Sequence, residues 1–160
     1  MRHITVVAVG LLLCGAATSA AAQGTAVEGG VSLVGGASAF QIGIRGTTAK
    51  PGGLGVDFAI ATYPDVLANG AFAALSDLAL EYRAPLGDAA TASIRAGGSA
   101  LLASADGLTA SAGGLNAGGG VIIRLGQKAG LRMDYTYRLF FTGGQTASLS
   151  SLTFGIHFGH

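Results

Sequence analysis

The side chains best suited to acid–base or metal chemistry in this 160-residue chain are its three histidines. His3 lies near the start, whereas His157 and His160 lie at the end. A lone histidine on a final strand is more often an interior hydrogen-bonding residue than a general base. Two histidines without a neighbouring cysteine also do not form a recognisable zinc site. We therefore predict no catalytic residues, no metal site, no cofactor and no enzymatic activity.

Glycine clusters are the next candidates, because glycine-rich loops can wrap phosphates. Gly53-Leu54-Gly55 and Gly118-Gly119-Gly120 are the clearest examples. Neither is framed by the strand, Gly-x-Gly-x-x-Gly turn and helix that a nucleotide-binding loop requires. Curvature of a sheet and tight packing explain glycines on β-strands better. The sequence therefore does not predict a nucleotide site.

The charged side chains follow a positional rule. Lys50 and Lys128 fall in predicted turns, whereas the arginines after residue 22 fall on the polar faces of predicted strands. Arginine pairs bidentately with carboxylates, so this pattern predicts a packed interior network, with a charged belt where the ends of even strands and the starts of odd strands share one level. The alternative is a polar face that happens to be rich in arginine. The predicted lumen charge network is Glu28, Arg45, Asp57, Glu81, Arg83, Arg95, Arg124, Arg132, Asp134, Arg138 and His157, with Glu28 and His157 at its edge.

Strands must position these groups, because apolar and polar residues alternate with period 2. In Leu131–Leu139 the odd positions are apolar or aromatic and the even positions are polar. Residues 75–82 also fit a helical stripe, so a helix remains an alternative there. We predict an all-β fold with eight strands, at Val27–Val34, Phe40–Arg45, Leu54–Ala61, Leu78–Arg83, Ala92–Leu102, Ala117–Leu125, Leu131–Leu139 and Leu152–Phe158.

The predicted connections alternate in length. Short turns are expected at Lys50–Gly53, Ala84–Asp88 and Gly126–Gly130. Longer connections are expected at Pro64–Phe72 with an Asn69-Gly70 turn, at Ala103–Gly114 and at Phe141–Ser148, whereas Gly35–Ser38 is a short exception. Short turns on one rim and longer loops on the other are typical of outer-membrane barrels, with the short side periplasmic.

Composition favours a lipid-facing exterior. Only 11% of residues are charged, against about 25% in soluble domains. A soluble barrel such as a lipocalin also alternates, but its water-exposed face would be richer in lysine and glutamate. A net charge of +1 without a basic cluster excludes nucleic acid as a partner. The predicted lipid-facing aromatic residues are Phe40, Phe58, Tyr82, Tyr135, Tyr137, Phe154 and Phe158.

The first 22 residues have the pattern of a secretory signal peptide. A basic start is followed by an apolar run, Ile4–Cys14, and by Ala20-Ala21-Ala22 before a predicted cleavage site. We predict a leader at 1–22 and one domain at 23–160. An uncleaved anchor and a lipoprotein acylated at Cys14 are alternatives, although Leu13 departs from the lipoprotein signature. Removal of Cys14 would leave the mature chain without a thiol.

The leader, the alternating strands and the ending Thr153–Phe158 together resemble the small outer-membrane β-barrel proteins of the OmpA/OmpX type. In that family the last strand ends in an aromatic residue, here Phe158, which the barrel-assembly machinery reads. The resemblance implies an eight-stranded antiparallel up-and-down transmembrane β-barrel in the outer membrane of a Gram-negative bacterium. Its implied partners are outer-membrane lipids and the assembly machinery, and we expect a monomer.

Three functions remain open at this point. We favour a non-enzymatic envelope protein with a structural or surface-interaction role. A narrow, porin-like pore or a route for a small solute is the main alternative. A lipid A-modifying enzyme is the third: the lipid A deacylases are similar in size, but they use a histidine with a serine two positions on. Here Gly159 stands two positions after His157, so no catalytic residue carries over.

Overall fold

The computed structural model describes residues 24–68 and 70–159. The predicted leader with Cys14, the Asn69 half of the predicted turn and His160 lie outside the described residues. The strands are β1 (Gly24–Val34), β2 (Ala37–Thr47), β3 (Leu54–Thr62), β4 (Phe72–Pro85), β5 (Ala90–Ala105), β6 (Leu108–Arg124), β7 (Ala129–Thr142) and β8 (Gln145–Gly159). A short helix, α2 (Pro64–Ala68), lies between β3 and β4.

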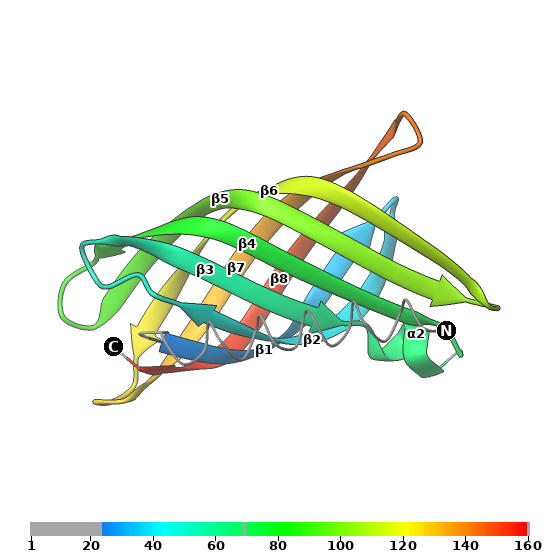
Figure 1. Ribbon diagram of the computed structural model, residues 1–160. Coiled ribbons are helices and arrows are strands. Elements are labelled where there is room, and N and C mark those ends of the chain that lie inside the picture. Colours follow the sequence, from blue (N-terminus) through cyan, green and yellow to red (C-terminus); the bar gives the residue numbers. More distant parts are fainter. Residues whose placement is uncertain (1–23, 69, 160) are drawn as a thin grey trace.

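The strands form a closed antiparallel barrel in sequence order (Figure 1). Each strand pairs with the next, and β1 pairs with β8 from Gly24 opposite Gly159 to Val34 opposite Leu149. The predicted all-β, eight-stranded up-and-down barrel is therefore confirmed. Closure pairs the first strand with the last, so each strand has a hydrogen-bonded neighbour on both sides over the middle of the barrel.

Two of the predicted long connections are wrong. β5 and β6 continue through 103–114 to a two-residue turn at Asp106-Gly107, and β7 and β8 continue to a turn at Gly143-Gly144. All four turn residues have positive φ, between 51° and 80°, as in the primed turns that match the twist of paired strands. The predicted contrast between a short-turn rim and a long-loop rim consequently does not hold, since only the β3–β4 connection is long.

β4 begins at Phe72, six residues before its predicted start, and residues 75–82 form strand. The helical alternative is therefore wrong for this segment. A helical stripe and a strand face share some apolar positions, and the flanking Ala and Ser residues of β4 contrast too weakly in polarity to separate them.

The β3–β4 connection contains α2, which lies beside β2 (Figure 1). Pairing of β2 with β3 begins only at Ile42, opposite Thr62, so the first part of β2 faces α2 instead. There the backbone N–H of Phe40 donates to Asp65 Oδ2 at 3.2 Å. Among the described residues no helix is both long and apolar enough to cross a membrane.

Glycines in the strands allow neighbouring side chains to enter the interior. A Cβ at Gly120 would collide with Asp134 Oδ1, and a Cβ at Gly155 would lie 3.0 Å from Glu28 Cγ. Gly120 and Gly155 thus leave space for two carboxylate side chains of the charge network. This observation accords with the interior-packing explanation of the strand glycines.

Candidate functional site: a charge-filled barrel interior

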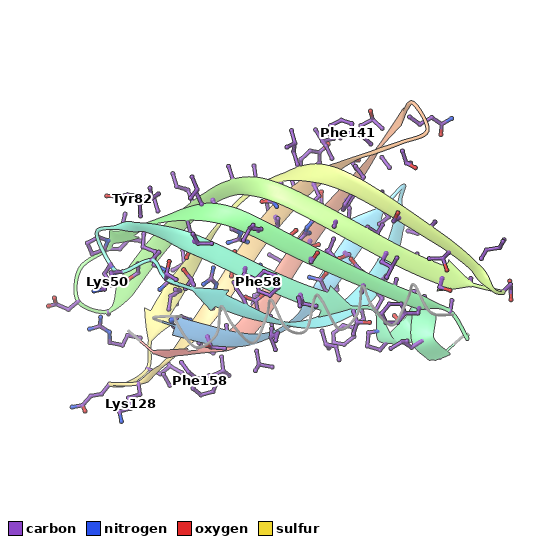
Figure 2. The ribbon with its side chains drawn as sticks, in the orientation of Figure 1. Lys50, Phe58, Tyr82, Lys128, Phe141 and Phe158 are labelled. Carbon is purple, nitrogen blue, oxygen red and sulfur yellow. The ribbon has the colours of Figure 1, made fainter. Side chains whose placement is uncertain are left out.

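The outward face of the barrel is apolar along its strands. The predicted lipid-facing aromatics point outward: Phe58 is half-buried, and the other six are between 40% and 55% exposed. Figure 2 shows Tyr82, Phe141 and Phe158 on the outside of the ribbon, and the two lysines near its end. Phe141, which was expected in a loop, also lies outward on β7 at 53% exposure.

The inward face holds the charged side chains. All predicted members of the lumen charge network except Arg124 are buried, namely Glu28, Arg45, Asp57, Glu81, Arg83, Arg95, Arg132, Asp134, Arg138 and His157. The structure adds Asp77, which is 3% exposed and which the sequence interpretation omitted. Asp77 precedes the predicted start of β4, but its alternation with Ala79 and Glu81 would have placed it inward.

Arg132 on β7 connects the largest cluster of carboxylates. Its Nε donates to Asp134 Oδ2 at 2.5 Å, and its Nη2 donates to Glu81 Oε1 at 2.9 Å. Glu28 and Asp57 lie within 3.7 and 3.8 Å of the same guanidinium. Four carboxylates from four strands therefore surround one buried cation, which offsets the desolvation cost of each charge.

Arg45 and Arg95 complete this cluster from either side. Arg45 donates through Nε to Glu28 Oε1 at 2.7 Å and through Nη1 to Asp57 Oδ1. Arg95 donates through Nη1 to Asp134 Oδ1 and through Nη2 to Thr136 Oγ1 at 2.6 Å. Predicted residues from distant parts of the sequence are thereby brought together across the lumen.

Arg138 is buried in the lumen, and it forms a second cluster with Asp77, separate from the cluster around Arg132. Its Nη2 donates to Asp77 Oδ2 at 2.6 Å and its Nε to Asp77 Oδ1 at 3.0 Å, so the pair is bidentate. Ser99 also donates to Asp77 at 2.6 Å, and Arg138 Nη1 donates to Ser151 at 2.7 Å. Hydroxyl groups thus satisfy the remaining sites of this ion pair.

Beyond the second cluster the interior becomes apolar, contrary to the predicted rule of polar residues inside. Leu75, Phe140, Leu149 and Tyr63 are buried together, and Val66 of α2 packs against them. The phenolic oxygen of Tyr63 lies 3.4 Å from Ser32 Oγ, and burial raises the pKa of Tyr63. These buried residues, Tyr63, Ala73, Leu75, Phe140 and Leu149, form an apolar plug that lies next to α2.

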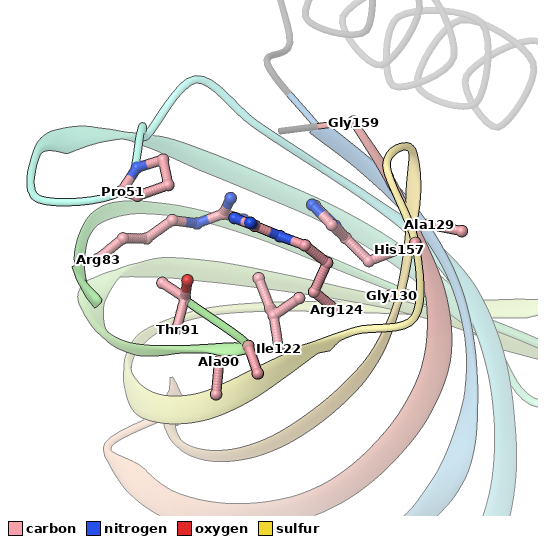
Figure 3. Close-up of a pocket in the computed structure, with 12 residues that line it drawn as sticks. Pro51, Arg83, Ala90, Thr91, Ile122, Arg124, Ala129, Gly130, His157 and Gly159 are labelled. Carbon is pink, nitrogen blue, oxygen red and sulfur yellow. The ribbon is translucent and has the colours of Figure 1, made fainter. Parts of the chain in front are cut away.

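The opposite rim, where β1 begins and β8 ends, is called the terminal rim below. Arg124 is exposed there and has no ion pair within 24–68 and 70–159. Its predicted membership of the buried network is therefore wrong. Arg124 is the last residue of β6, so its side chain reaches solvent at the end of the barrel. Figure 3 shows Arg124 beside Arg83 and His157 around a small cavity.

The interior charges balance. Five buried carboxylates, Glu28, Asp57, Asp77, Glu81 and Asp134, contact five buried arginines, Arg45, Arg83, Arg95, Arg132 and Arg138. A mid-lumen cavity lined by Glu28, Arg45 and Arg138 measures about 10 Å³, so it has room for no more than about one water molecule. In the part of the chain that the structure describes, no group of three His, Cys or acidic residues is arranged to hold a metal.

Solved structures share this architecture. Neisserial surface protein A superposes with a TM-score of 0.60 at 14% identity, over 86% of this chain and 95% of that chain. The N-terminal β-barrel domain of Pseudomonas aeruginosa OprF gives 0.59 at 13% identity, over 86% and 98%. The fold is that of the small outer-membrane β-barrels. Ail of Yersinia pestis, solved with the heparin analogue sucrose octasulfate, gives 0.54 at 10% identity, over 84% and 94%.

The predicted resemblance to small outer-membrane β-barrels of the OmpA/OmpX type is thus confirmed at the level of the fold. No protein-family model matches the chain, and neither does any curated protein. Identities of 10% to 14% do not transfer ligands or activities. The function must therefore be argued from the surface and the interior of this chain.

Proposed function

We propose that this chain is a non-enzymatic integral protein of the bacterial outer membrane, with a structural or surface-interaction role. The observation that carries the proposal is the reversed polarity of the barrel. Charged residues are buried and ion-paired inside, whereas large apolar residues cover the outside. A bilayer is the solvent in which both faces are satisfied, because its core accepts apolar side chains and excludes unpaired charges.

The exposed apolar surface is too extensive for a water-soluble monomer. Leu78, Leu80 and Ile94 are adjacent on β4 and β5 and are between 57% and 66% exposed. Soluble monomers rarely expose contiguous apolar patches larger than a few hundred Å². Here similar side chains occur on the other strands too, so outer-membrane lipids are the partner that this surface fits.

The interior supports a sealed barrel rather than the pore alternative. The cluster around Arg132 fills one part of the lumen, and the apolar plug next to α2 fills another. Conduction would require these ion pairs to open and an ion to pass apolar side chains. A stabilising role in the envelope is more compatible with this filling than solute transport.

The surface-interaction part of the proposal rests on two hairpins. Residues 105–111 and 141–148 are exposed on both faces of their strands, so the tips of β5–β6 and β7–β8 extend beyond the barrel wall (Figure 1). β6 has 17 residues, whereas crossing a bilayer takes about 9–11. Leu108 and Phe141 place apolar side chains on these tips, at 78% and 53% exposure. Such tips can contact a partner without a long loop.

Expression of the full chain in a Gram-negative host tests the location. We expect the protein in the outer-membrane fraction, a gel shift between heated and unheated samples, and a mature N-terminus at Gln23. Recovery as a freely soluble monomer without detergent would overturn the proposal.

Planar-bilayer recording on the refolded protein tests the sealed lumen. We expect no steady channels, since ion pairs and the apolar plug fill the interior. Steady conductance that changes when Arg132 or Arg138 is replaced would favour the pore alternative instead. Lipid A analysis with and without His157→Ala addresses the enzymatic alternative, and we expect no modification in either case.

A further inference from the structure

The terminal rim contains three basic side chains around one cavity. Arg83, Arg124 and His157 come from the ends of β4, β6 and β8 and line a cavity of about 40 Å³ (Figure 3). The antiparallel order of the barrel places the ends of the even strands at this rim. The three side chains therefore converge although 74 residues separate the first from the last in sequence.

Two of these side chains are buried with polar atoms that have no partner. Arg83 is 2% exposed and His157 is 4% exposed, and neither Arg83 Nη2 nor His157 Nδ1 has a hydrogen-bond partner among the described residues. Arg83 contacts Glu81 Oε2 only through Nε, at 3.1 Å. A buried guanidinium N–H without an acceptor costs free energy, so binding of a ligand that accepts a hydrogen bond from it would be favourable.

The local charge points to an anion. The carboxylates of the interior are already engaged by arginines, whereas Arg124 has no acidic partner in 24–68 and 70–159. The five buried carboxylates of the interior balance its five buried arginines, and Glu81 is the partner of Arg83 in that balance. The cavity is therefore bordered by two guanidinium groups and an imidazole, and Arg124 supplies the unbalanced positive charge at the rim.

We infer that this cavity binds a small oxyanion of the phosphate class. A volume of about 40 Å³ corresponds to roughly three water molecules, which suits a single tetrahedral group and excludes a nucleotide or a sugar. Guanidinium groups donate in a planar fork that matches phosphate oxygens, and Thr91 adds a hydroxyl to the lining. This site goes beyond the proposed envelope role and does not depend on it, since the rim exists in detergent as in a membrane.

The test uses the full-length refolded protein in a non-ionic detergent. Inorganic phosphate is titrated against chloride at equal ionic strength and constant pH, and binding is followed by calorimetry and by the urea midpoint. We expect saturable binding of one phosphate and a higher urea midpoint in phosphate than in chloride. Equal midpoints together with no calorimetric saturation would overturn the inference.

Arg124→Gln is the informative variant, because Arg124 is exposed and holds no ion pair, so the barrel should fold without it. We expect at least a tenfold weaker affinity for phosphate, whereas the control Lys128→Gln, which removes a turn cation four residues away, should bind like the parent. Equal losses in both variants would indicate only general attraction of anions and would contradict a built site.

The source of the oxyanion is distinguished by repeating the titration in vesicles. If free phosphate is the ligand, the protein should bind it equally in phosphatidylcholine vesicles and in vesicles that also contain phosphatidylglycerol. If a lipid headgroup enters the rim, phosphatidylglycerol should compete and lower the apparent phosphate affinity in the parent but not in Arg124→Gln. Absence of phosphate binding in both vesicles and detergent would contradict the site itself.

Discussion

The interior of this barrel depends on individual arginines that each contact more than one acceptor. Arg132 is the clearest case, since it contacts Asp134 and Glu81 and lies near two further carboxylates. A buried ion pair adds little net stability compared with apolar residues that fill the same space, but removal of one partner leaves the other charge uncompensated. A single substitution in the network should therefore lower the free energy of unfolding by much more than the number of hydrogen bonds it removes suggests.

Arg132→Met preserves bulk but removes the charge that Asp134 and Glu81 share. We expect the free energy of unfolding to fall by about 3–5 kcal/mol, as when one partner of a buried pair is removed. Urea unfolding in detergent micelles, followed by gel shift and circular dichroism, measures this loss. Lys128→Gln is the matched control, because Lys128 lies in an exposed turn, and it should change stability little. Similar losses in both variants would contradict the central position of Arg132.

A second residue-scale prediction concerns the glycines of β6. Gly120→Ala would place a methyl group against Asp134 Oδ1 and the backbone carbonyl oxygen of Met133, whereas a Cβ at Gly113 on the same strand meets no atom within 4 Å. We expect Gly120→Ala to lower the free energy of unfolding by about 1–3 kcal/mol through overpacking. Gly113→Ala should be neutral or slightly stabilising. An unchanged urea midpoint for Gly120→Ala would show that Asp134 and the backbone at Met133 shift without cost.

At the scale of the strand, β4 illustrates how one element serves two environments. Its odd residues from Ala73 to Arg83 are buried and change from apolar to charged along the lumen, whereas Leu78 and Leu80 face outward. The strand therefore contributes to the apolar plug at one end and to the charge network at the other. Its stability contributions should divide according to the face on which a residue lies.

Leu75→Ala and Leu80→Ala test this division. Leu75 is 2% exposed inside the apolar plug, whereas Leu80 is 58% exposed on the outer face. Leu75→Ala leaves a cavity in a packed interior and should cost about 2–5 kcal/mol. Leu80→Ala should cost clearly less, because lipid or detergent can fill the space. The two losses of stability are compared through urea midpoints measured in the same detergent. Equal losses in Leu75→Ala and Leu80→Ala would argue that the outer face is packed against protein.

The sequence predicts the centres of the strands better than their ends. Leu131–Leu139 alternates strongly because arginines and tyrosines differ greatly in polarity, and most of the buried charges were recognisable on that basis. Residues 103–114 consist largely of small residues whose alternation is weak, so the long β5–β6 hairpin was missed. The Asp106-Gly107 pair could have indicated this hairpin, since Asp-Gly is typical of a two-residue hairpin turn.

The contacts within the lumen were less predictable than its composition. Alternation places a side chain inside, but the register between distant strands decides which partner it contacts. Arg138 and Asp77 are 61 residues apart, and their bidentate pairing follows only from the closed sheet. The inward apolar residues Leu75, Phe140 and Leu149 were also missed, because the inner face changes polarity along the barrel.

For the whole molecule, the central question is which solvent the outer face meets. Leu78 lies near the middle of β4, opposite Phe58 on β3 and Gly98 on β5, and is 57% exposed. If this face contacts acyl chains, an arginine there must enter the hydrocarbon. If it contacts water, the same arginine would be tolerated.

We predict that Leu78→Arg lowers the free energy of unfolding from bilayers by about 2–4 kcal/mol, the cost of arginine near the midplane of a transmembrane barrel. Leu108→Arg is the control, because Leu108 is 78% exposed on the β5–β6 tip and should be neutral. Reversible unfolding by guanidinium in phosphatidylcholine vesicles provides the measurement. Equal tolerance of both substitutions would place the outer face in water.

The seam between β1 and β8 has a consequence for how the molecule is made. Because β8 must pair with β1, the cylinder cannot close until β8 has been synthesised. A chain halted before β8 would present two unpaired edges, and within hydrocarbon each bare amide costs several kcal/mol. Shortened products should therefore not persist as narrower barrels, and assembly into the bilayer should be all-or-none and slow, as expected for pairing between the most distant segments of a chain.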